Sequence, residues 1–158
     1  MSVPERIRQR LSRTDRRGAG RAVDAAPVDM AVQVGSVKLR APVMTASGTA
    51  GHGDELADYV DLSRLGAVVV KSLGAEPWAG NPAPRVHQTA AGMINSVGLQ
   101  GPGVARWRAE ELPALVGTGA AVVVSIWGRS VDDYARAAEA IATCPAQVVA
   151  VEVNLSCP

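Results

Sequence analysis

The sequence QVVAVEV at residues 147–153 runs directly into NLSCP at residues 154–158. The first part is a nearly continuous run of β-branched and small apolar residues, which predicts a strand buried on both faces, as in parallel sheets. The second part places an amide, a hydroxyl and a thiol just past the carboxyl end of that strand, where α/β folds carry their chemistry. A buried strand normally continues through a loop into a covering helix, so we expect the site-bearing half of a larger fold.

The same pattern repeats upstream of this stretch. Short apolar runs alternate with helical stretches, which predicts an α/β fold of strand–helix units with right-handed crossovers, either an open sheet or half of a barrel. Apolar and polar residues alternate around Gly35-Ser36, which predicts a β-hairpin over residues 30–40. The predicted strands are residues 43–46, 67–70, 120–124 and 147–153, and the predicted helices are residues 54–60, 104–116 and 131–142, the last opened by Ser130.

One segment, residues 74–103, has no obvious regular structure and is rich in Gly and Pro. Loops of this length inside a compact domain are usually functional. It holds NPAPRV at residues 81–86 and GMINSVGLQ at residues 92–100. The second piece offers a run of backbone N–H groups beside the amide of Asn95, which suits a small planar ligand or a carboxylate. The alternative is a glycine-rich turn that only packs.

Polar residues stand at the end of every predicted strand: Ser47, then Lys71 and Ser72, then Ser125, then Asn154 and Cys157. In a parallel barrel these positions converge on one face. A lysine just past a run of valines is partly desolvated and can bind an anion or stabilise developing negative charge. We therefore expect a site at this face, with Lys71 inside it rather than extended into solvent.

Cys157 has the chemistry of a nucleophile, a metal ligand or a general base. No second Cys or His stands at zinc-ligand spacing, so no metal site is predicted. His52 and His87 lie in loops, and we expect surface or structural roles for them, although a Cys–His pair that meets only in space stays open. Cys144, at the end of a predicted helix, is expected to be an inert small residue. Neither a Walker loop nor a dinucleotide-binding glycine motif follows a strand.

The composition of the chain is that of a globular protein, with 47% apolar and 20% charged residues and a net charge of +1. Residues 1–26 form an arginine-rich extension that we expect to be flexible, and residues 27–158 form the folded part. The extension is expected to be solvated, the alternative being contact with nucleic acid or an anionic membrane. It lacks the apolar core of a secretory signal, and no stretch is apolar enough to span a bilayer. A cytoplasmic location without nucleic-acid or membrane partners is the expectation.

Taken together, these motifs resemble the dihydroorotate dehydrogenase family, and in particular its soluble, cysteine-using class. The resemblance extends from about Val37 to Pro158, and its strength lies in the order and spacing of short motifs. They are Ala46-Ser47-Gly48, Val70-Lys71-Ser72, GNPAPR at residues 80–85, MINSVGLQ at residues 93–100 and NLSCP at residues 154–158. The resemblance implies the N-terminal half of an FMN-binding (β/α)8 TIM barrel, preceded by the β-hairpin, that oxidises (S)-dihydroorotate to orotate in pyrimidine biosynthesis.

The resemblance also assigns roles to residues. Cys157 is implied to be the general base that removes the C5 proton while the C6 hydride passes to the flavin. A cysteine suits this role because its pKa of about 8.5 needs only modest lowering near neutrality. The residues implied to bind FMN are Ala46, Ser47, Lys71, Ser72, Ser125 and Asn154. The residues implied to bind substrate are Lys71, Asn95, Ser96, Val97, Gly98, Leu99 and Asn154, with the N–H groups of residues 97–99 on the orotate carboxylate.

Some residues depart from the family pattern. Ser125 stands where close relatives often place an Asn against FMN, Val97 where they have Met or Ile, and Gly101 where an Asn is frequent. Trp127 also departs from the expected pattern. The motifs favour the type that pairs with an iron–sulfur flavoprotein subunit and reduces NAD, and a homodimer is implied. A fumarate-using homodimer, a dihydropyrimidine dehydrogenase and a non-catalytic half-barrel paralogue are the alternatives.

Overall fold

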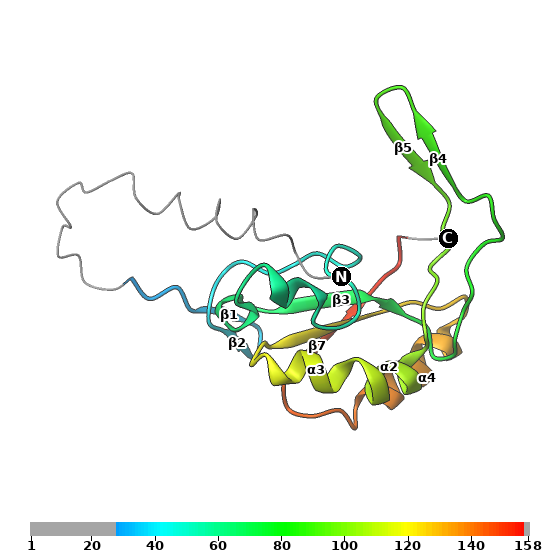
Figure 1. Ribbon diagram of the computed structural model, residues 1–158. Coiled ribbons are helices and arrows are strands. Elements are labelled where there is room, and N and C mark those ends of the chain that lie inside the picture. The colour runs from blue at the N-terminus through cyan, green and yellow to red at the C-terminus, as the bar shows by residue number, and fades with distance from the viewer. Residues whose placement is uncertain (1–27, 157–158) are drawn as a thin grey trace.

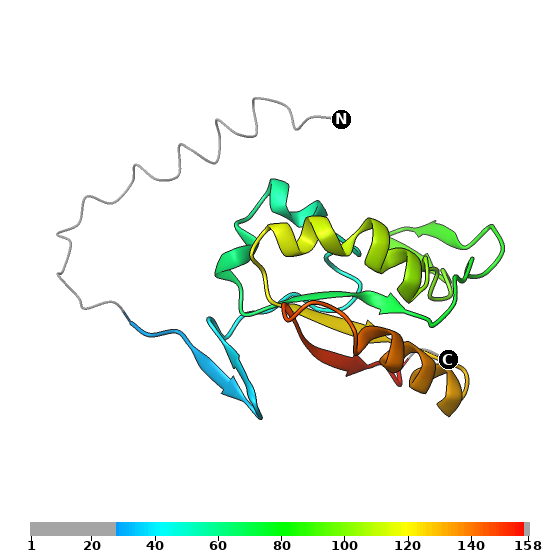
Figure 2. The same ribbon diagram turned by 90° about the horizontal axis from the view of Figure 1, so that it is seen from below.

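The computed structural model describes residues 28–156. Residues 1–27, with the arginine-rich stretch, and residues 157–158, with Cys157, lie outside the described part. At its centre is a parallel sheet of three strands in the order β3 (Val68–Leu73), β6 (Val122–Ile126) and β7 (Val148–Val153), visible in Figures 1 and 2. This confirms the predicted α/β class with parallel strands. The described residues form an open sheet and do not close a barrel.

Three helices pack on one face of this sheet: α2 (Val104–Glu110), α3 (Leu112–Gly117) and α4 (Val131–Ile141). Figure 1 shows them together on the same side of the strands. Their apolar residues form the main core with alternate residues of β3 and β6, and Trp107 and Leu115 are completely buried there. Figure 2 shows the helices in front of the sheet they cover. Among the helices described, none is long and apolar enough to cross a bilayer.

The other face of the sheet is covered by the predicted β-hairpin. Strands β1 (Val32–Val34) and β2 (Val37–Leu39) pair antiparallel around Gly35, whose φ of +57° suits a residue without a side chain. Leu39 packs against Val69 and Val123, which point away from the helices because strand residues alternate between faces. The hairpin is thus tied to the sheet through a second, smaller apolar cluster.

The prediction of a strand at residues 43–46 is wrong, although this segment does lie beside β3 as expected. The segment pairs with the sheet only at the single parallel bridge between Met44 and Ala67. The Thr45 hydroxyl replaces the rest of the ladder, since it accepts from Val69 N at 2.8 Å and donates to Val69 O at 3.3 Å. A side chain here takes the hydrogen bonds that a neighbouring backbone would otherwise form.

Two predicted helices are also shorter than expected. Residues 54–60 form only a 3-10 turn, η2 (Glu55–Asp58), followed by a second one, η3 (Leu62–Arg64), whose start is capped by Asp61. Residues 104–116 form two helices that meet at Glu111, because Pro113 in the first turn of α3 cannot continue the ladder of α2. The helix predicted at residues 131–142 is confirmed as α4, and the Ser130 and Asp133 side chains form a reciprocal capping box at its start.

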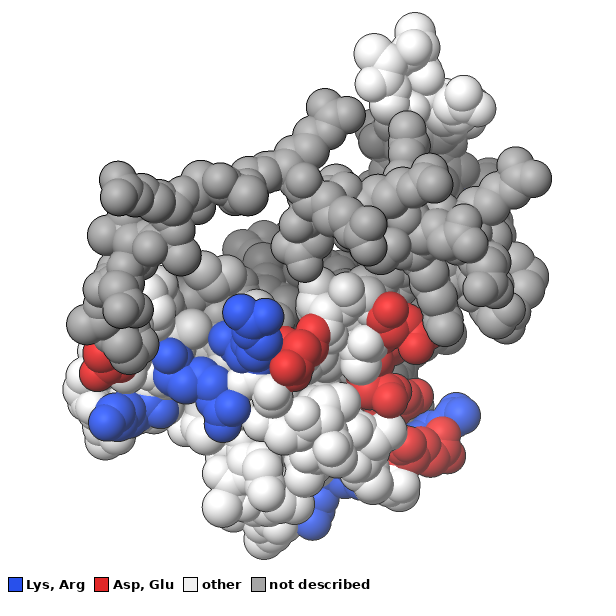
Figure 3. All heavy atoms as spheres, turned by 60° about the vertical axis from the view of Figure 1, so that its left-hand side comes forward, with Lys and Arg blue, Asp and Glu red and all other residues white. Residues whose placement is uncertain are grey.

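The segment of residues 74–103, hereafter the arm, is not irregular throughout. It contains a second hairpin, β4 (Val86–Thr89) paired antiparallel with β5 (Gly92–Asn95), which projects from the body in Figure 1. Every residue of β4 and β5 is exposed. On the face drawn in Figure 3, basic and acidic side chains both occur, with uncharged surface between them.

Candidate functional site

A cluster of polar side chains lies at the carboxyl ends of the strands, centred on Ser72. The Ser72 hydroxyl is 2.8 Å from the Ser125 hydroxyl and 3.2 Å from the Ser47 hydroxyl, and it accepts a hydrogen bond from Asn154 Nδ2 at 3.0 Å. Ser72 is 3% exposed and Ser125 is fully buried. Parallel strands end at the same edge, so residues 25 to 82 positions apart meet here. The structure thus brings four of the predicted site residues together.

Asn154 is fixed through its backbone as well as its side chain. Its N–H donates to Ile126 O at 2.9 Å, and its carbonyl accepts from the Tyr134 hydroxyl at 2.6 Å. Its Oδ1 accepts from both the N–H and the hydroxyl of Ser156, at 3.0 and 2.9 Å. This Asx turn sets the direction in which the chain leaves β7. Cys157, the residue implied to be the base, follows at once and lies outside the described residues.

The arm carries a second group of polar atoms, the backbone of residues 96–99. Three successive carbonyls of this loop accept hydrogen bonds from a short segment upstream. Asn81 Nδ2 donates to Ser96 O at 2.8 Å and Asn81 N to Val97 O at 3.0 Å, and Trp78 Nε1 donates to Gly98 O at 2.9 Å. In a trans peptide the N–H points opposite to the carbonyl. The N–H groups of Val97, Gly98 and Leu99 therefore point away from that segment, and none has an acceptor among the described residues.

Left-handed backbone conformations shape this loop. Gly98 has φ of +74° and Leu99 has φ of +58°, the only non-glycine residue of the described part with positive φ. A Cβ at Gly98 would lie 2.7 Å from the Asn81 side chain, so only glycine fits. Strain at a residue such as Leu99 persists where surrounding contacts determine it, often at ligand sites. Here Arg85 contributes by donating to Asn81 O at 3.1 Å, to Ala79 O at 2.9 Å and to the Gln100 side chain.

Lys71 lies between the strand ends and the arm. It lines a cavity together with His52, Trp78 and Gln100, the residue that follows Leu99. Burial lowers the pKa of His52, the Lys71 ammonium lowers it further, and Glu55 partly opposes both. His52 is therefore neutral near pH 7, and the charged side chains that line the cavity are the cations Lys71 and Arg106 and the carboxylate of Glu111. The arrangement suits a bound anion.

A comparison with known protein families identifies the group to which these residues belong. The family model described as "Dihydroorotate dehydrogenase" matches residues 29–158, which include the strand ends and the arm. The chain belongs to the dihydroorotate dehydrogenase family. The resemblance read from the motifs is thereby confirmed.

Similar curated proteins are dihydroorotate dehydrogenase B (NAD(+)) catalytic subunits from several bacteria. The relative from Geotalea uraniireducens is 45% identical over 130 residues, covering 82% of this chain and 42% of the relative. Those from Alkaliphilus metalliredigens and Desulforudis audaxviator are 47% and 50% identical over 131 residues, with 83% of this chain covered in both cases and 43% and 42% of the relatives. The chain thus spans about two fifths of the length of these relatives.

Among solved structures, the fold is similar to a dihydroorotate dehydrogenase from Eimeria tenella crystallised with ferulenol. The TM-score is 0.61 at 18% identity, and the match covers 100% of this chain and 45% of that one. At this identity the likeness concerns the fold alone. It supports the arrangement of sheet, helices and arm described above as part of a dihydroorotate dehydrogenase fold.

Not every residue that the family resemblance singled out lies in the same place. Asn95 and Ser96 line a hollow beside the hairpin with Arg85 and Ile94, apart from the cavity that Lys71 lines. Ala46 is exposed and directly precedes the turn that contains Ser47. Ser125 has no exposed surface and contacts the rest of the cluster through Ser72. The substrate and cofactor roles of these residues stay predictions.

Sequence reasoning missed the side chains that hold the site of this dihydroorotate dehydrogenase homologue in place. Asn81 and Arg85 were recognised only as parts of a motif, and Trp78 and Tyr134 were not singled out. His52 was expected to be a surface or structural histidine; its carbonyl accepts from Trp107 Nε1 at 2.7 Å, and it also lines the cavity beside Lys71. A usable signal was the tryptophan at position 78, the one Trp, Tyr or Phe in the Gly- and Pro-rich sequence of residues 74–103. Its indole N–H needs a partner once the ring is buried.

Proposed function

We propose that the protein that contains this chain is an FMN-dependent dihydroorotate dehydrogenase, which oxidises (S)-dihydroorotate to orotate in pyrimidine biosynthesis. In this proposal the open sheet is the first part of a (β/α)8 barrel. The observation that carries the proposal is the run of three N–H groups at Val97, Gly98 and Leu99, held outward and without acceptors among the described residues. Such a run binds the oxygens of a carboxylate.

The substrate is held at both of its ends in this proposal. The three N–H groups bind its carboxylate, and the Lys71 ammonium supplies the opposite charge. Asn95, Ser96 and Asn154 are assigned to the pyrimidine ring, because amide groups match its alternating N–H donors and carbonyl acceptors. This assignment requires the hollow that Asn95 and Ser96 line to meet the cavity that Lys71 lines. Because Asn154 Nδ2 already donates to Ser72, one of its two hydrogens remains for a ligand.

The residues at the strand ends fit a flavin. Hydroxyl, amide and ammonium groups suit the polar edge of an isoalloxazine ring, and the buried Ser72 hydroxyl lies among them. FMN would be held by Ala46, Ser47, Lys71, Ser72 and Asn154, with Ser125 supporting Ser72. When bound, FMN supplies the acceptor for the hydride from C6.

The chain's own chemical step is a proton transfer. Cys157 acts as general base, and its thiolate takes the proton from C5 of dihydroorotate. A thiol near neutrality is a workable base once its pKa is lowered modestly. The Asx turn at Asn154 fixes the chain immediately before this residue.

The proposed partners rest on the relatives' names and on the motif resemblance. These relatives are catalytic subunits of NAD(+)-linked enzymes. We propose that this protein is likewise the catalytic subunit of an NAD-linked enzyme. As the motif resemblance implies, it forms a homodimer and passes electrons to an iron–sulfur flavoprotein subunit that reduces NAD. Turnover with fumarate in the absence of such a subunit would contradict this part of the proposal.

The decisive experiment follows flavin absorbance in the native protein purified from its source under anaerobic conditions. Dihydroorotate is expected to bleach the flavin, and Cys157→Ala to slow this reduction by about 100-fold or more, the usual contribution of a general base. Cys144→Ala is the matched control and is expected to bleach at the parent rate, because Cys144 lies beside the core near the end of α4. Absence of bleaching in the parent protein would refute the proposed function. Equal rates for both variants would refute only the assignment of the base.

A further inference from the structure

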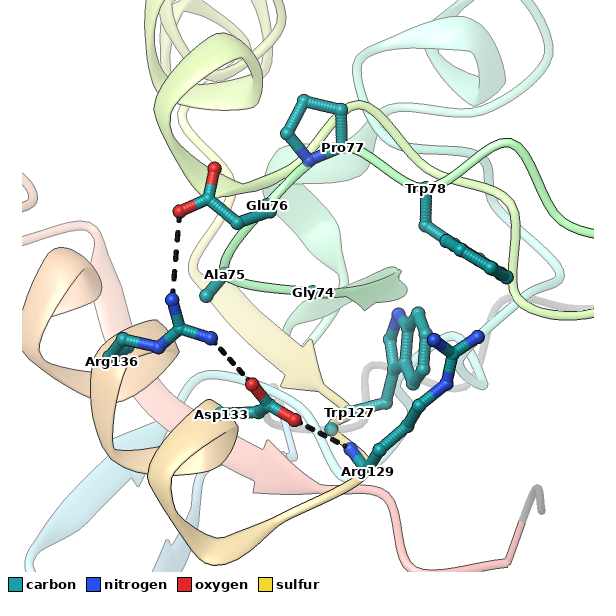
Figure 4. A pocket seen from close by; sticks show the side chains of 10 residues that line it. Gly74, Ala75, Glu76, Pro77, Trp78, Trp127, Arg129, Asp133 and Arg136 are labelled. Carbon is teal, nitrogen blue, oxygen red and sulfur yellow. Dashed lines mark hydrogen bonds and ion pairs between the residues drawn. The ribbon is translucent and has the colours of Figure 1, made fainter.

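Trp78 connects two regions of the molecule that carry different roles. Its indole N–H donates to Gly98 O at 2.9 Å, and its backbone N–H and carbonyl form a two-way bridge with Gly101, both bonds at 2.9 Å. It also lines the cavity that Lys71 lines. On its other side it lines a second pocket, shown in Figure 4, with residues that follow β6.

The hydrogen bond to Gly98 determines where one specific N–H points. The carbonyl of Gly98 and the N–H of Leu99 belong to the same planar peptide unit, so fixing one fixes the other. Asn81 fixes the two preceding peptides in the same way, through Ser96 O and Val97 O. Trp78 is thus the third of three anchors and the one that orients the Leu99 N–H, at the residue with the strained φ of +58°.

Trp78 is itself held by a cation. The Arg129 guanidinium lies 4.0 Å from the centroid of the Trp78 ring and 5.9 Å from that of Trp127, and the two indoles meet edge to face at 6.5 Å. Figure 4 shows this guanidinium beside both rings. The backbone of Arg129 is fixed in turn, since its N–H donates to Asp133 Oδ2 at 3.0 Å in the cap of α4.

We infer that Trp78 is a positioning residue for the substrate's carboxylate, held in place by Arg129. The inference rests on the proposed function, because it assigns the Leu99 N–H to that carboxylate. Trp78 acts on affinity through the Gly98–Leu99 peptide and takes no part in the transfer of the proton or the hydride. Loss of its N–H therefore weakens binding of the carboxylate and leaves the chemistry at saturation intact.

The neighbouring indole provides a matched control. Trp127 Nε1 is buried and has no hydrogen-bond partner in the described part of the chain. Trp78→Phe and Trp127→Phe therefore make the same chemical change at rings that touch, but only the first removes a hydrogen bond. Trp78→Phe also keeps an aromatic face for Arg129.

The test measures the dissociation constant of orotate, from the perturbed flavin spectrum of the native protein, and the KM and kcat for dihydroorotate. Trp78→Phe is expected to raise the orotate Kd and the KM by about 3- to 10-fold, the worth of one neutral hydrogen bond, with kcat within about twofold of the parent. Trp127→Phe is expected to keep the orotate Kd, the KM and the kcat within about twofold of the parent values. Equal effects of the two variants, or a fall in kcat without a rise in KM, would overturn the inference.

A second variant keeps the inference testable if Trp78→Phe does not fold, which its flavin content and melting temperature reveal. Arg129→Gln removes only an exposed cation from the face of the indole and is expected to raise the orotate Kd by about 2- to 3-fold, in line with a modest cation–π contact. An unchanged Kd in Arg129→Gln would remove Arg129 from the inference. If the parent protein binds no orotate, the proposed function fails. If the parent binds orotate and Trp78→Phe binds it equally well, only the inference about Trp78 fails. The orotate Kd of the parent therefore distinguishes the two failures.

Discussion

The central sheet and the arm are built by different forces. Every residue of β6 is buried and β3 is buried except at Lys71, whereas every residue of β4 and β5 in the arm is exposed. The sheet is thus held by apolar burial against α2, α3 and α4. A two-stranded hairpin is only marginally stable by itself, and the arm depends instead on hydrogen bonds from Trp78, Asn81 and Arg85.

This contrast separates stability from ligand binding along the chain. Apolar burial is non-directional and tolerates small shifts, but a carboxylate needs N–H groups at fixed positions. The arm provides such positions because the carbonyls of Ser96, Val97 and Gly98 each accept from one N–H donor of Asn81 or Trp78. The sheet provides the platform on which Lys71 and Ser72 stand. Changes in the sheet should therefore alter folding, and changes in the arm should alter binding.

The largest expected difference comes from the same substitution in the two regions. Ile126 in β6 is 1% exposed and Ile94 in β5 is 62% exposed. Ile126→Ala is expected to lower the free energy of unfolding by about 2–5 kcal/mol, because it leaves a cavity in the core. Ile94→Ala is expected to change it by less than about 0.5 kcal/mol. Denaturant unfolding of both variants measures this, and a large cost at Ile94 would mean that something covers the hairpin.

The strand-end cluster tests whether polar contacts in the sheet count toward folding. Ser72→Ala removes the group that Ser125 and Asn154 both contact, leaving a fully buried hydroxyl without its partner. The expected loss of unfolding free energy is about 1–3 kcal/mol. Ser156→Ala, at an exposed hydroxyl that contacts the same Asn154, is the control and should cost less than about 0.5 kcal/mol. Similar losses of unfolding free energy in both variants would show that burial of the strand-end cluster does not contribute to stability.

The arm is most directly disturbed at Gly98. Gly98→Ala places a Cβ 2.7 Å from the Asn81 side chain at a φ of +74°, so the loop must shift. The orotate Kd is expected to rise by about 10-fold or more while the melting temperature changes little, in keeping with a loss of about one or two aligned N–H donors. Gly117→Ala near the end of α3, where nothing lies within 4 Å of the new Cβ, should leave binding unchanged. Parent-like binding by Gly98→Ala would contradict the role of the loop.

The smallest effect is expected from pH, at the junction of the two regions. Burial and Lys71 lower the pKa of His52 below its ordinary 6.5, so the unfolded chain binds a proton more readily than the folded one. The contribution of His52 to the free energy of unfolding then rises as pH increases from the pKa of the folded state to 6.5. Above pH 6.5 this contribution is constant. His52→Gln is expected to flatten that rise in melting curves taken between pH 5 and 7. An unchanged slope would show that His52 does not contribute.

Much of the fold could be predicted because its signals are local. The apolar runs predicted β3, β6 and β7, the alternation around Gly35 predicted the β1–β2 hairpin, and Ser130 predicted the start of α4. The β4–β5 hairpin was missed because its residues face solvent on both sides and show no alternation. The prediction of burial on both faces is wrong for β7, whose last residues are exposed in the described structure.

For the site, the sequence by itself determined which residues stand at the strand ends and that a glycine-rich loop follows one of them, but it left open whether the N–H groups of that loop are free or the loop only packs. Both follow from composition and order along the chain. Only the tertiary structure decided that Ser72 joins Ser47, Ser125 and Asn154, and that Trp78 and Asn81 hold the loop at residues 96–99. The physical reason is directionality: a hydrogen bond depends on the distance and angle between two groups, and for residues distant along the chain these exist only once the chain has folded.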